Sequence, residues 1–299
     1  MDDEAFDRES DAASPTDLSR REFVALSVGG LAAAATSVSA AELPVVEDNV
    51  EIKTSDGTCD AAFIHPKTGT HPGVLIWPDA FGLRPAMRDI AKRLAAEGYS
   101  VLVPNPFYRV AKAPVFQDAS SFSFQNPADT AKLQPLMASV NAAGAAEKDA
   151  AAYIAFLDAQ QPVNKTKKIG TQGYCMGGPL VVKTAAAVSA RVGAGASFHG
   201  GGLVTDKPDS PHLLAPKIKA RMYFGIASND DARQPDAKDK LREAFAAAKV
   251  PAEIEVYPGA LHGWCVPDMP TQNGAPIYNK AAAERAWGKL LALYKTALA

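Results

Sequence analysis

Short runs of apolar residues recur along the chain and alternate with longer segments that mix apolar and polar positions. The run at 73–77 is apolar throughout, which predicts a central strand buried on both faces of a sheet. The segment at 85–97 begins with a proline and is stopped by Gly98, which predicts a helix. Because strands and helices alternate, we expect an α/β fold with a doubly wound, mostly parallel sheet. Further strands are expected at 99–103, 169–173, 192–198, 221–227 and 252–257, and further helices at 146–159, from Met176, at 236–249 and from 281 to the C-terminus.

Two regions depart from this alternation. The segments 50–54 and 59–65 flank the turn signal Ser55-Asp56-Gly57, which predicts a hairpin at one edge of the sheet. Residues 110–145 contain prolines and aromatic residues and predict an irregular cap or lid insertion. No internal repeat or linker indicates a second domain, so residues 42–299 are expected to form one domain.

The segment before residue 42 has the features of an export signal. The pair Arg20-Arg21 precedes an apolar run at 24–40 that ends in the small-x-small pattern Val38-Ser39-Ala40. This order resembles a twin-arginine signal; the alternative is a disordered tail in which the arginine pair arises by chance. We therefore expect residues 1–41 to be a signal peptide or disordered. The mature domain is then exported by the twin-arginine machinery to the periplasm or beyond, without a stable membrane span.

Composition narrows the classes of partner. The chain has 299 residues, is 47% hydrophobic and carries a formal net charge of −2, with no basic stripe that would predict nucleic-acid binding. The cysteines are Cys59, Cys175 and Cys265, an odd number, so at least one is not in an intramolecular disulfide. Their spacing does not predict a zinc site, and a bridge between Cys59 and Cys265 stays open. We expect no metal and no cofactor.

The clearest chemical motif is Gly173-Tyr174-Cys175-Met176-Gly177. Gly-x-Cys-x-Gly between a strand and a helix is the nucleophile elbow of α/β-hydrolases, with cysteine in place of serine. The central residue of such a turn is strained, so its neighbours two positions away must lack bulk. The thiol then lies at the N-terminus of a helix, where the dipole and the N–H groups favour a thiolate. Cys175 is therefore a candidate nucleophile; the alternative is a small buried apolar residue.

Candidate partners for this thiol follow it in the order found in α/β-hydrolases, which is nucleophile, acid, histidine. Asp230 and Asp231 follow one expected strand, and His262 follows the next. The order leaves the choice between the two aspartates open, and predicts His262 as the base. His199, at the end of another strand, is expected to be a pocket wall or a turn residue.

Three motifs together resemble the dienelactone hydrolase family: residues 173–178, the segment 257–263 around His262, and Asp79-Ala80-Phe81-Gly82 before a helix. The resemblance covers residues 48–297 and implies the α/β-hydrolase fold. It also implies a triad of Cys175, His262 and Asp230 or Asp231, and an oxyanion hole formed by the N–H groups of Met176 and Ala80.

The same resemblance implies two further roles. Asp79 matches a carboxylate, usually glutamate in the family, that accepts a hydrogen bond from the thiol. Arg109 matches an arginine that holds the substrate carboxylate, whereas the position of a second such arginine is Val266 here.

The expected activity is hydrolysis of a small-molecule ester or lactone through a thioester on Cys175. Four aromatic residues are candidates for the apolar wall of the site, and each is equally consistent with a position in the hydrophobic core: Phe81, Tyr108, Phe116 and Trp264. Two alternatives stay open. One is a carboxylesterase or thioesterase that uses the same triad, and the other is a non-catalytic protein that keeps the fold as a binding module.

Overall fold

The computed structural model describes residues 42–272 and 274–299. The predicted export signal lies outside the described residues, so the signal, the export route and the location of the mature domain stay predictions. Within the described part, no helix is both long enough and apolar enough to cross a bilayer.

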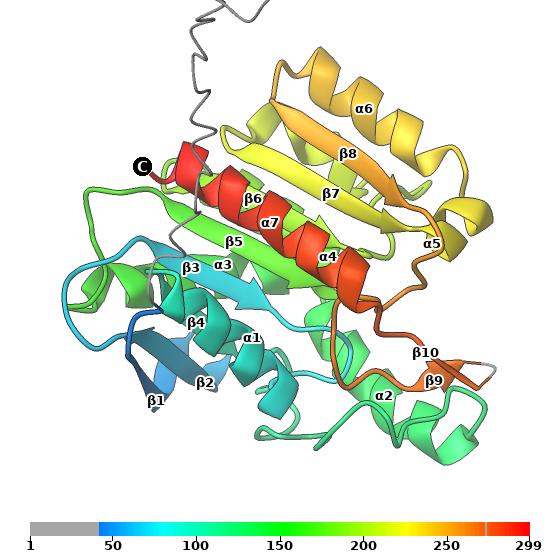
Figure 1. The fold of residues 1–299 in the computed structure, drawn as a ribbon, viewed down its shortest axis with the longest axis horizontal. Coiled ribbons are helices and arrows are strands. Elements are labelled where there is room, and N and C mark those ends of the chain that lie inside the picture. Colours follow the sequence, from blue (N-terminus) through cyan, green and yellow to red (C-terminus); the bar gives the residue numbers. More distant parts are fainter. Residues whose placement is uncertain (1–41, 273) are drawn as a thin grey trace, which may run out of the picture. The chain divides into compact units, whose positions relative to one another are not determined.

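An eight-stranded sheet forms the centre of the described unit (Figure 1), with the strand order β1-β2-β4-β3-β5-β6-β7-β8. The first two strands form the predicted edge hairpin, and β2 also runs antiparallel to β4. All other neighbours are parallel, which confirms the mostly parallel sheet. The strands are β1 (Val45–Thr54), β2 (Gly57–Pro66), β3 (Gly73–Trp77), β4 (Ser100–Pro104), β5 (Ile169–Tyr174), β6 (Val192–Phe198), β7 (Arg221–Ala227) and β8 (Ala252–Tyr257).

Helices cover both faces of this sheet, as in other doubly wound folds. Helices α1 (Pro85–Ala96) and α7 (Lys280–Ala297) pack on one face and lie in front of the strands in Figure 1. Helices α3 (Ala145–Ala159), α4 (Gly177–Ala187) and α6 (Ala237–Ala247) pack on the other face. This arrangement determines where the candidate site lies, because the loops after parallel strands meet at the carboxyl edge of the sheet.

Side-chain alternation in β3 explains why its sequence is apolar throughout. Leu75 and Trp77 enter the core beneath α3 and α4, whereas Val74 and Ile76 enter the core beneath α1 and α7. All four are at most 1% exposed. Successive side chains of a strand point to opposite faces, so a strand between two helical layers has no polar face.

The insertion at 110–145 contains a helix that the sequence interpretation did not assign. Helix α2 (Pro127–Val140) follows Asn126, whose Oδ1 accepts a hydrogen bond from the N–H of Ala128 at 3.0 Å. Asparagine followed by proline is a common start of a helix, so this signal was present in the sequence. Shorter elements were also not predicted: α5 (Ser228–Arg233), the 3₁₀ helix η1 (Pro211–Lys217), β9 (Thr271–Gln272) and β10 (Ala275–Pro276).

The rest of the insertion packs its aromatic residues on the loop after β3. Phe81 contacts the rings of Phe116 and Phe122 at centroid distances of 5.7 and 5.1 Å. Phe122 in turn packs against Phe124 at 4.8 Å, although Phe124 is 66% exposed. The insertion is therefore joined to the carboxyl edge of the sheet through Phe81, next to the predicted oxyanion residue Ala80.

Candidate active site

Cys175 lies at the sharp turn between β5 and α4, in the left-handed backbone region with φ of 51°. Its N–H donates to the carbonyl of Phe198 at 3.1 Å, which ties the turn to the end of β6. A Cβ on Gly177 would lie 2.3 Å from the carbonyl oxygen of Trp77, and a Cβ on Gly173 would lie 2.2 Å from the carbonyl oxygen of Gly177. Both glycines are therefore required by close approach of backbone to backbone, as the elbow pattern predicts.

The two backbone N–H groups that the resemblance implies for the oxyanion hole make no hydrogen bond among the described residues. Among the hydrogen bonds of the described residues, none is donated by the N–H of Met176 or of Ala80. The next two N–H groups of the loop after β3 are both used, since Phe81 donates to Oδ1 of Asp79 at 2.9 Å and Gly82 donates to its carbonyl at 3.0 Å. The geometry thus leaves the two N–H groups that the family resemblance implies for an oxyanion hole.

The structure distinguishes between the two candidate aspartates. Oδ2 of Asp230 lies 2.6 Å from Nδ1 of His262, whereas Oδ1 of Asp231 lies 2.7 Å from the ammonium of Lys238. Asn229 also holds the histidine loop, because its Oδ1 accepts the N–H of His262 at 2.9 Å. Asp230 is therefore the aspartate that orients the imidazole, as the order of the sequence allowed but did not decide.

The protonation of His262 depends on both of its neighbours. Burial disfavours the imidazolium, but side-chain hydrogen bonds with Asp230 and with Cys175 outweigh it and raise the pKa of His262 to about 10. Negative charge on the Asp230 carboxylate and on the Cys175 sulfur stabilises the positive charge of the ring. The imidazole is therefore influenced by an acid and by a candidate nucleophile, which is the arrangement that a base in a triad has.

His199 lies directly beside His262. Its ring centroid is 4.9 Å from that of His262 and 5.2 Å from the centroid of Trp264, in edge-to-face geometry. The side chain is 1% exposed, and neither ring nitrogen has a hydrogen-bond partner among the described residues. Burial, followed by the charge on His262, lowers the pKa of His199 well below its usual range, so the ring is neutral. The predicted role of His199 as a wall residue is compatible with this packing. The ring that it packs against is that of His262.

Asp79 contacts an arginine that the sequence interpretation did not single out. Arg84 donates from Nη1 to Oδ1 of Asp79 at 2.7 Å and from Nη2 to Oδ2 at 3.0 Å. Oδ1 also accepts the N–H of Phe81, and Asp79 is 1% exposed. Both carboxylate oxygens thus accept hydrogen bonds from Arg84, and no hydrogen bond joins Asp79 to Cys175 among the described residues. The role of Asp79 toward the thiol stays a prediction.

Arg109 differs in the same way from its implied role. Its Nη1 and Nη2 donate to the two carboxylate oxygens of Asp149 at 2.8 Å each. Its Nε and Nη2 also donate to Asp56 at 3.1 and 2.7 Å. The neighbouring Tyr108 donates to Asp149 at 2.8 Å as well, so it belongs to this ion-pair network. The guanidinium is therefore engaged by two carboxylates and offers no free pair of donors to a substrate carboxylate.

The remaining predicted wall residues are mostly core. Trp264 is 0% exposed and stacks on Tyr257 with centroids 4.8 Å apart. Val266, in the position of the second arginine of the family, is also 0% exposed. Phe81 and Phe116 belong to the aromatic cluster of the cap. Trp264 is thus a fully buried side chain, and no described side chain at these positions supplies a free positive charge.

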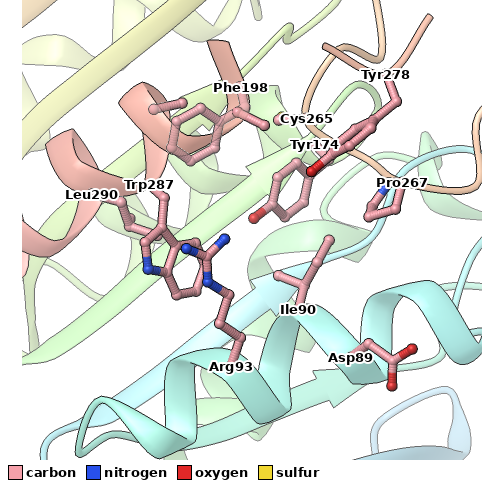
Figure 2. A pocket seen from close by; sticks show the side chains of 12 residues that line it. Asp89, Ile90, Arg93, Tyr174, Phe198, Cys265, Pro267, Tyr278, Trp287 and Leu290 are labelled. Carbon is pink, nitrogen blue, oxygen red and sulfur yellow. The ribbon is translucent and has the colours of Figure 1, made fainter. Parts of the chain in front are cut away.

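All three cysteines are free thiols. Cys59 is buried, and its Sγ accepts a hydrogen bond from the hydroxyl of Tyr153 at 3.3 Å. Cys265 faces an apolar cleft of about 200 Å³ between α1 and α7, where Tyr174 and Trp287 also point (Figure 2). The bridge between Cys59 and Cys265 is therefore not formed. Within residues 42–272 and 274–299, no group of three or more metal-ligating side chains comes together.

Gly177→Ala tests the backbone contact at the elbow. The new Cβ would clash with the Trp77 carbonyl, so we expect a loss of about 1–3 kcal/mol in the free energy of unfolding, or a failure to fold. The matched control is Gly288→Ala, because Gly288 also lies in a helix but has nothing within 4 Å of its added Cβ. The free energy of unfolding of that variant should rise by up to about 1 kcal/mol, because alanine favours a helix more than glycine does. Denaturant unfolding measures both, and equal effects of the two substitutions would contradict the packing argument.

The raised pKa of His262 predicts a pH dependence with a definite sign. Because its folded pKa is about 10 and its ordinary value is 6.5, its contribution to stability is complete below pH 6.5 and is lost as the pH rises toward 10. We expect Asp230→Asn to lower the pKa of His262 toward its ordinary value. NMR of the ring protons as a function of pH measures this titration midpoint. Asp231→Asn is the control and should leave it in place. An unchanged midpoint in Asp230→Asn would show that the carboxylate does not stabilise the imidazolium.

Known proteins resemble this chain over most of its length. Residues 59–298 match the model of the dienelactone hydrolase family. A protein of Synechocystis named "Putative carboxymethylenebutenolidase" is 28% identical over 233 residues, covering 77% of this chain and 88% of the relative. A protein of the same name from Methylorubrum extorquens is 27% identical over 300 residues, covering 96% of each chain.

The solved structures support the same fold. A dienelactone hydrolase-like promiscuous phosphotriesterase from metagenomic libraries superposes with a TM-score of 0.69 at 23% identity, covering 85% of this chain and 99% of that one. At this identity the likeness shows the α/β-hydrolase fold alone. The family model, by contrast, matches far more than half of the sequence. The chain therefore belongs to the dienelactone hydrolase family.

Proposed function

We propose that this protein hydrolyses the acyl bond of a small carboxylic ester or lactone, with Cys175 as the nucleophile. One observation carries the proposal: Asp230 is hydrogen-bonded to the His262 ring, and Cys175, which acts on the same ring, lies at an elbow followed by the unbonded N–H of Met176. Membership of the dienelactone hydrolase family supports it. Curated relatives are named for a lactone hydrolase, which supports the ester or lactone as the bond that is broken.

The acylation step follows from these positions. The Cys175 sulfur attacks the carbonyl carbon, and the carbonyl oxygen becomes an oxyanion that accepts hydrogen bonds from the N–H groups of Met176 and Ala80. The tetrahedral intermediate collapses when the bond to the leaving oxygen breaks, and the His262 imidazolium gives that oxygen its proton. An alcohol, or the opened hydroxyl end of a lactone, and a thioester on Cys175 result.

Water completes the reaction through the same groups. Neutral His262 takes a proton from a water molecule as its oxygen attacks the thioester carbon. The same two N–H groups stabilise the second oxyanion, which then expels the Cys175 thiolate and releases the carboxylic acid. Asp230 keeps the imidazole in one orientation and stabilises its charge in both steps.

The charges around the site favour a substrate without a carboxylate. Arg109 is bound by Asp149 and Asp56, and buried Val266 stands where the family has its second arginine. A substrate anion would have to displace one of these ion pairs. We therefore propose, as a second candidate within the same chemistry, a carboxylesterase or thioesterase that acts on uncharged esters.

Turnover of p-nitrophenyl acetate and of cis-dienelactone tests both proposals. We expect Cys175→Ser, His262→Ala and Asp230→Asn each to lower kcat by roughly 10²-fold or more. The matched controls are Cys265→Ser and Asp231→Asn, which should retain wild-type turnover. Mass spectrometry after iodoacetamide treatment should find Cys175 alkylated before Cys59 and Cys265.

The outcomes separate the candidates. A much higher rate with the acetate ester than with the dienelactone supports the esterase, and the reverse supports the lactone hydrolase and a carboxylate site that includes Arg109. Turnover that survives Cys175→Ser and His262→Ala would refute the triad. Absence of turnover with a thiol of ordinary reactivity would favour the non-catalytic binding protein.

A further inference from the structure

Arg84 is a buried arginine whose contacts join three separate segments of the carboxyl edge. Its side chain is fully buried, between Asp79 in the loop after β3 and Asp268 in the segment after His262. Besides its two bonds to Asp79, it donates from Nε and Nη2 to the two oxygens of Asp268 at 2.7 Å each. Nη1 also donates to the carbonyl of Gly82 at 3.3 Å. These bonds employ every N–H group that a guanidinium has.

The carboxylate of Asp79 transmits this anchoring to the backbone of the oxyanion loop. Its Oδ1 accepts the N–H of Phe81, and its carbonyl accepts the N–H of Gly82. Gly82 has φ of 72°, and a Cβ there would lie 2.8 Å from the ring of Phe107. The loop therefore has little freedom to rearrange, and the N–H of Ala80 is the one left free beside these two.

Asp268 extends the same anchoring to the histidine loop and to the cap. It follows His262 by six positions in the sequence, and its Oδ2 accepts the N–H of Ala119 at 3.2 Å. Ala119 is 0% exposed and packs in the aromatic cluster with Phe81. The Arg84 guanidinium thus contacts the loop after β3 and the segment after His262 directly. It is connected to the cap through Asp268.

Electrostatics indicates that this cluster serves geometry rather than stability. Removing charges from water is costly, and buried ion pairs seldom stabilise a fold more than apolar residues of equal volume would. What the guanidinium supplies is a rigid fork that binds two carboxylates at fixed angles, which the single ammonium of a lysine does not reproduce. A position that required only packing would be filled more favourably by an apolar side chain.

We propose that Arg84 is a positioning residue that fixes the Ala80 N–H as an oxyanion donor relative to Cys175 and His262. The inference rests on the proposed hydrolase function. It also assigns Asp79 a role, which is to connect Arg84 to the oxyanion loop. In this proposal the base for the thiol is His262.

The proposal separates two reactions of the same thiol. Ester hydrolysis develops charge on a carbonyl oxygen and requires the oxyanion donors, whereas alkylation by iodoacetamide displaces iodide at a CH₂ carbon and does not. We therefore expect Arg84→Lys and Arg84→Met to lower kcat for p-nitrophenyl acetate roughly 10²-fold or more, with KM changed little. The rate of alkylation of Cys175 should stay within about two-fold of wild type, because the three side chains Cys175, His262 and Asp230 keep their contacts.

Arg88→Met is the matched control. Arg88 lies in the first turn of α1 and also bonds an acid, Glu47 at 2.6 Å, but that pair is partly exposed and Glu47 belongs to the edge strand β1. It should leave both rates unchanged. Wild-type turnover in Arg84→Met would overturn the proposal. An equal fall in turnover and in alkylation would also overturn it, because that result would mean a general loss of structure.

Hydrogen exchange gives a readout that does not require activity. In Arg84→Lys, and in Asp268→Asn if the arginine variants do not fold, amides of residues 79–84, 115–122 and 264–270 should exchange faster together, while those of α7 stay unchanged. If the three segments respond independently, the proposal fails even in an active protein. If the wild type shows no ester turnover, the proposed function fails, and the exchange result alone decides whether Arg84 holds the three segments.

Discussion

The contact between the backbone of Gly177 and the carbonyl of Trp77 is the constraint on which the site depends. It brings the first turn of α4 against the last residue of β3, so the loop that follows β3 begins next to the elbow. Ala80 stands three positions after Trp77, and Met176 stands one position before Gly177. The close approach of two backbones thus brings the start of the loop that carries Ala80 against the start of α4, and no side chain larger than hydrogen at residue 177 allows it.

Around this contact, almost every charge at the carboxyl edge has an internal partner. Asp230 is bound to His262, Asp79 and Asp268 to Arg84, and Asp149 to Arg109. The groups left for the proposed substrate are a thiol, an imidazole and two N–H dipoles. A site of this kind would select its ligand through the carbonyl that reacts and through shape. The proposed preference for uncharged esters rests on this pairing of charges among the described residues.

The sequence predicted the parts of this molecule that local pattern and chain order determine. The run at 73–77 and the glycines around Cys175 specify the central strand and the elbow, because their causes lie within a few residues. The order of Cys175, Asp230 and His262 gave the candidate chain of hydrogen bonds. It did not separate Asp230 from Asp231, because that choice depends on where α5 begins and on Lys238, which takes the second carboxylate.

The partners of Asp79 and Arg109 differ in how far away they lie in the sequence. Asp79 is bonded to Arg84, five positions along the chain, whereas Arg109 is bonded to Asp149, 40 positions away. Asp268, the second acid on Arg84, lies 184 positions from it, so the pattern around residue 79 did not reveal this cluster. A carboxylate in a predicted site is equally consistent with binding a thiol or an arginine until the fold brings one of them within reach.

The neutral state of His199 completes the electrostatics of the site. The rings of His199 and His262 are 4.9 Å apart in edge-to-face contact, and His199 is buried. Charging both rings at once would therefore cost considerable free energy. Burial lowers the pKa of His199, while the hydrogen bonds of His262 raise its own, so the environment separates two chemically identical rings. The proton that the proposed reaction needs is therefore confined to the ring that touches the thiol. His199 therefore packs against His262 without competing for that proton.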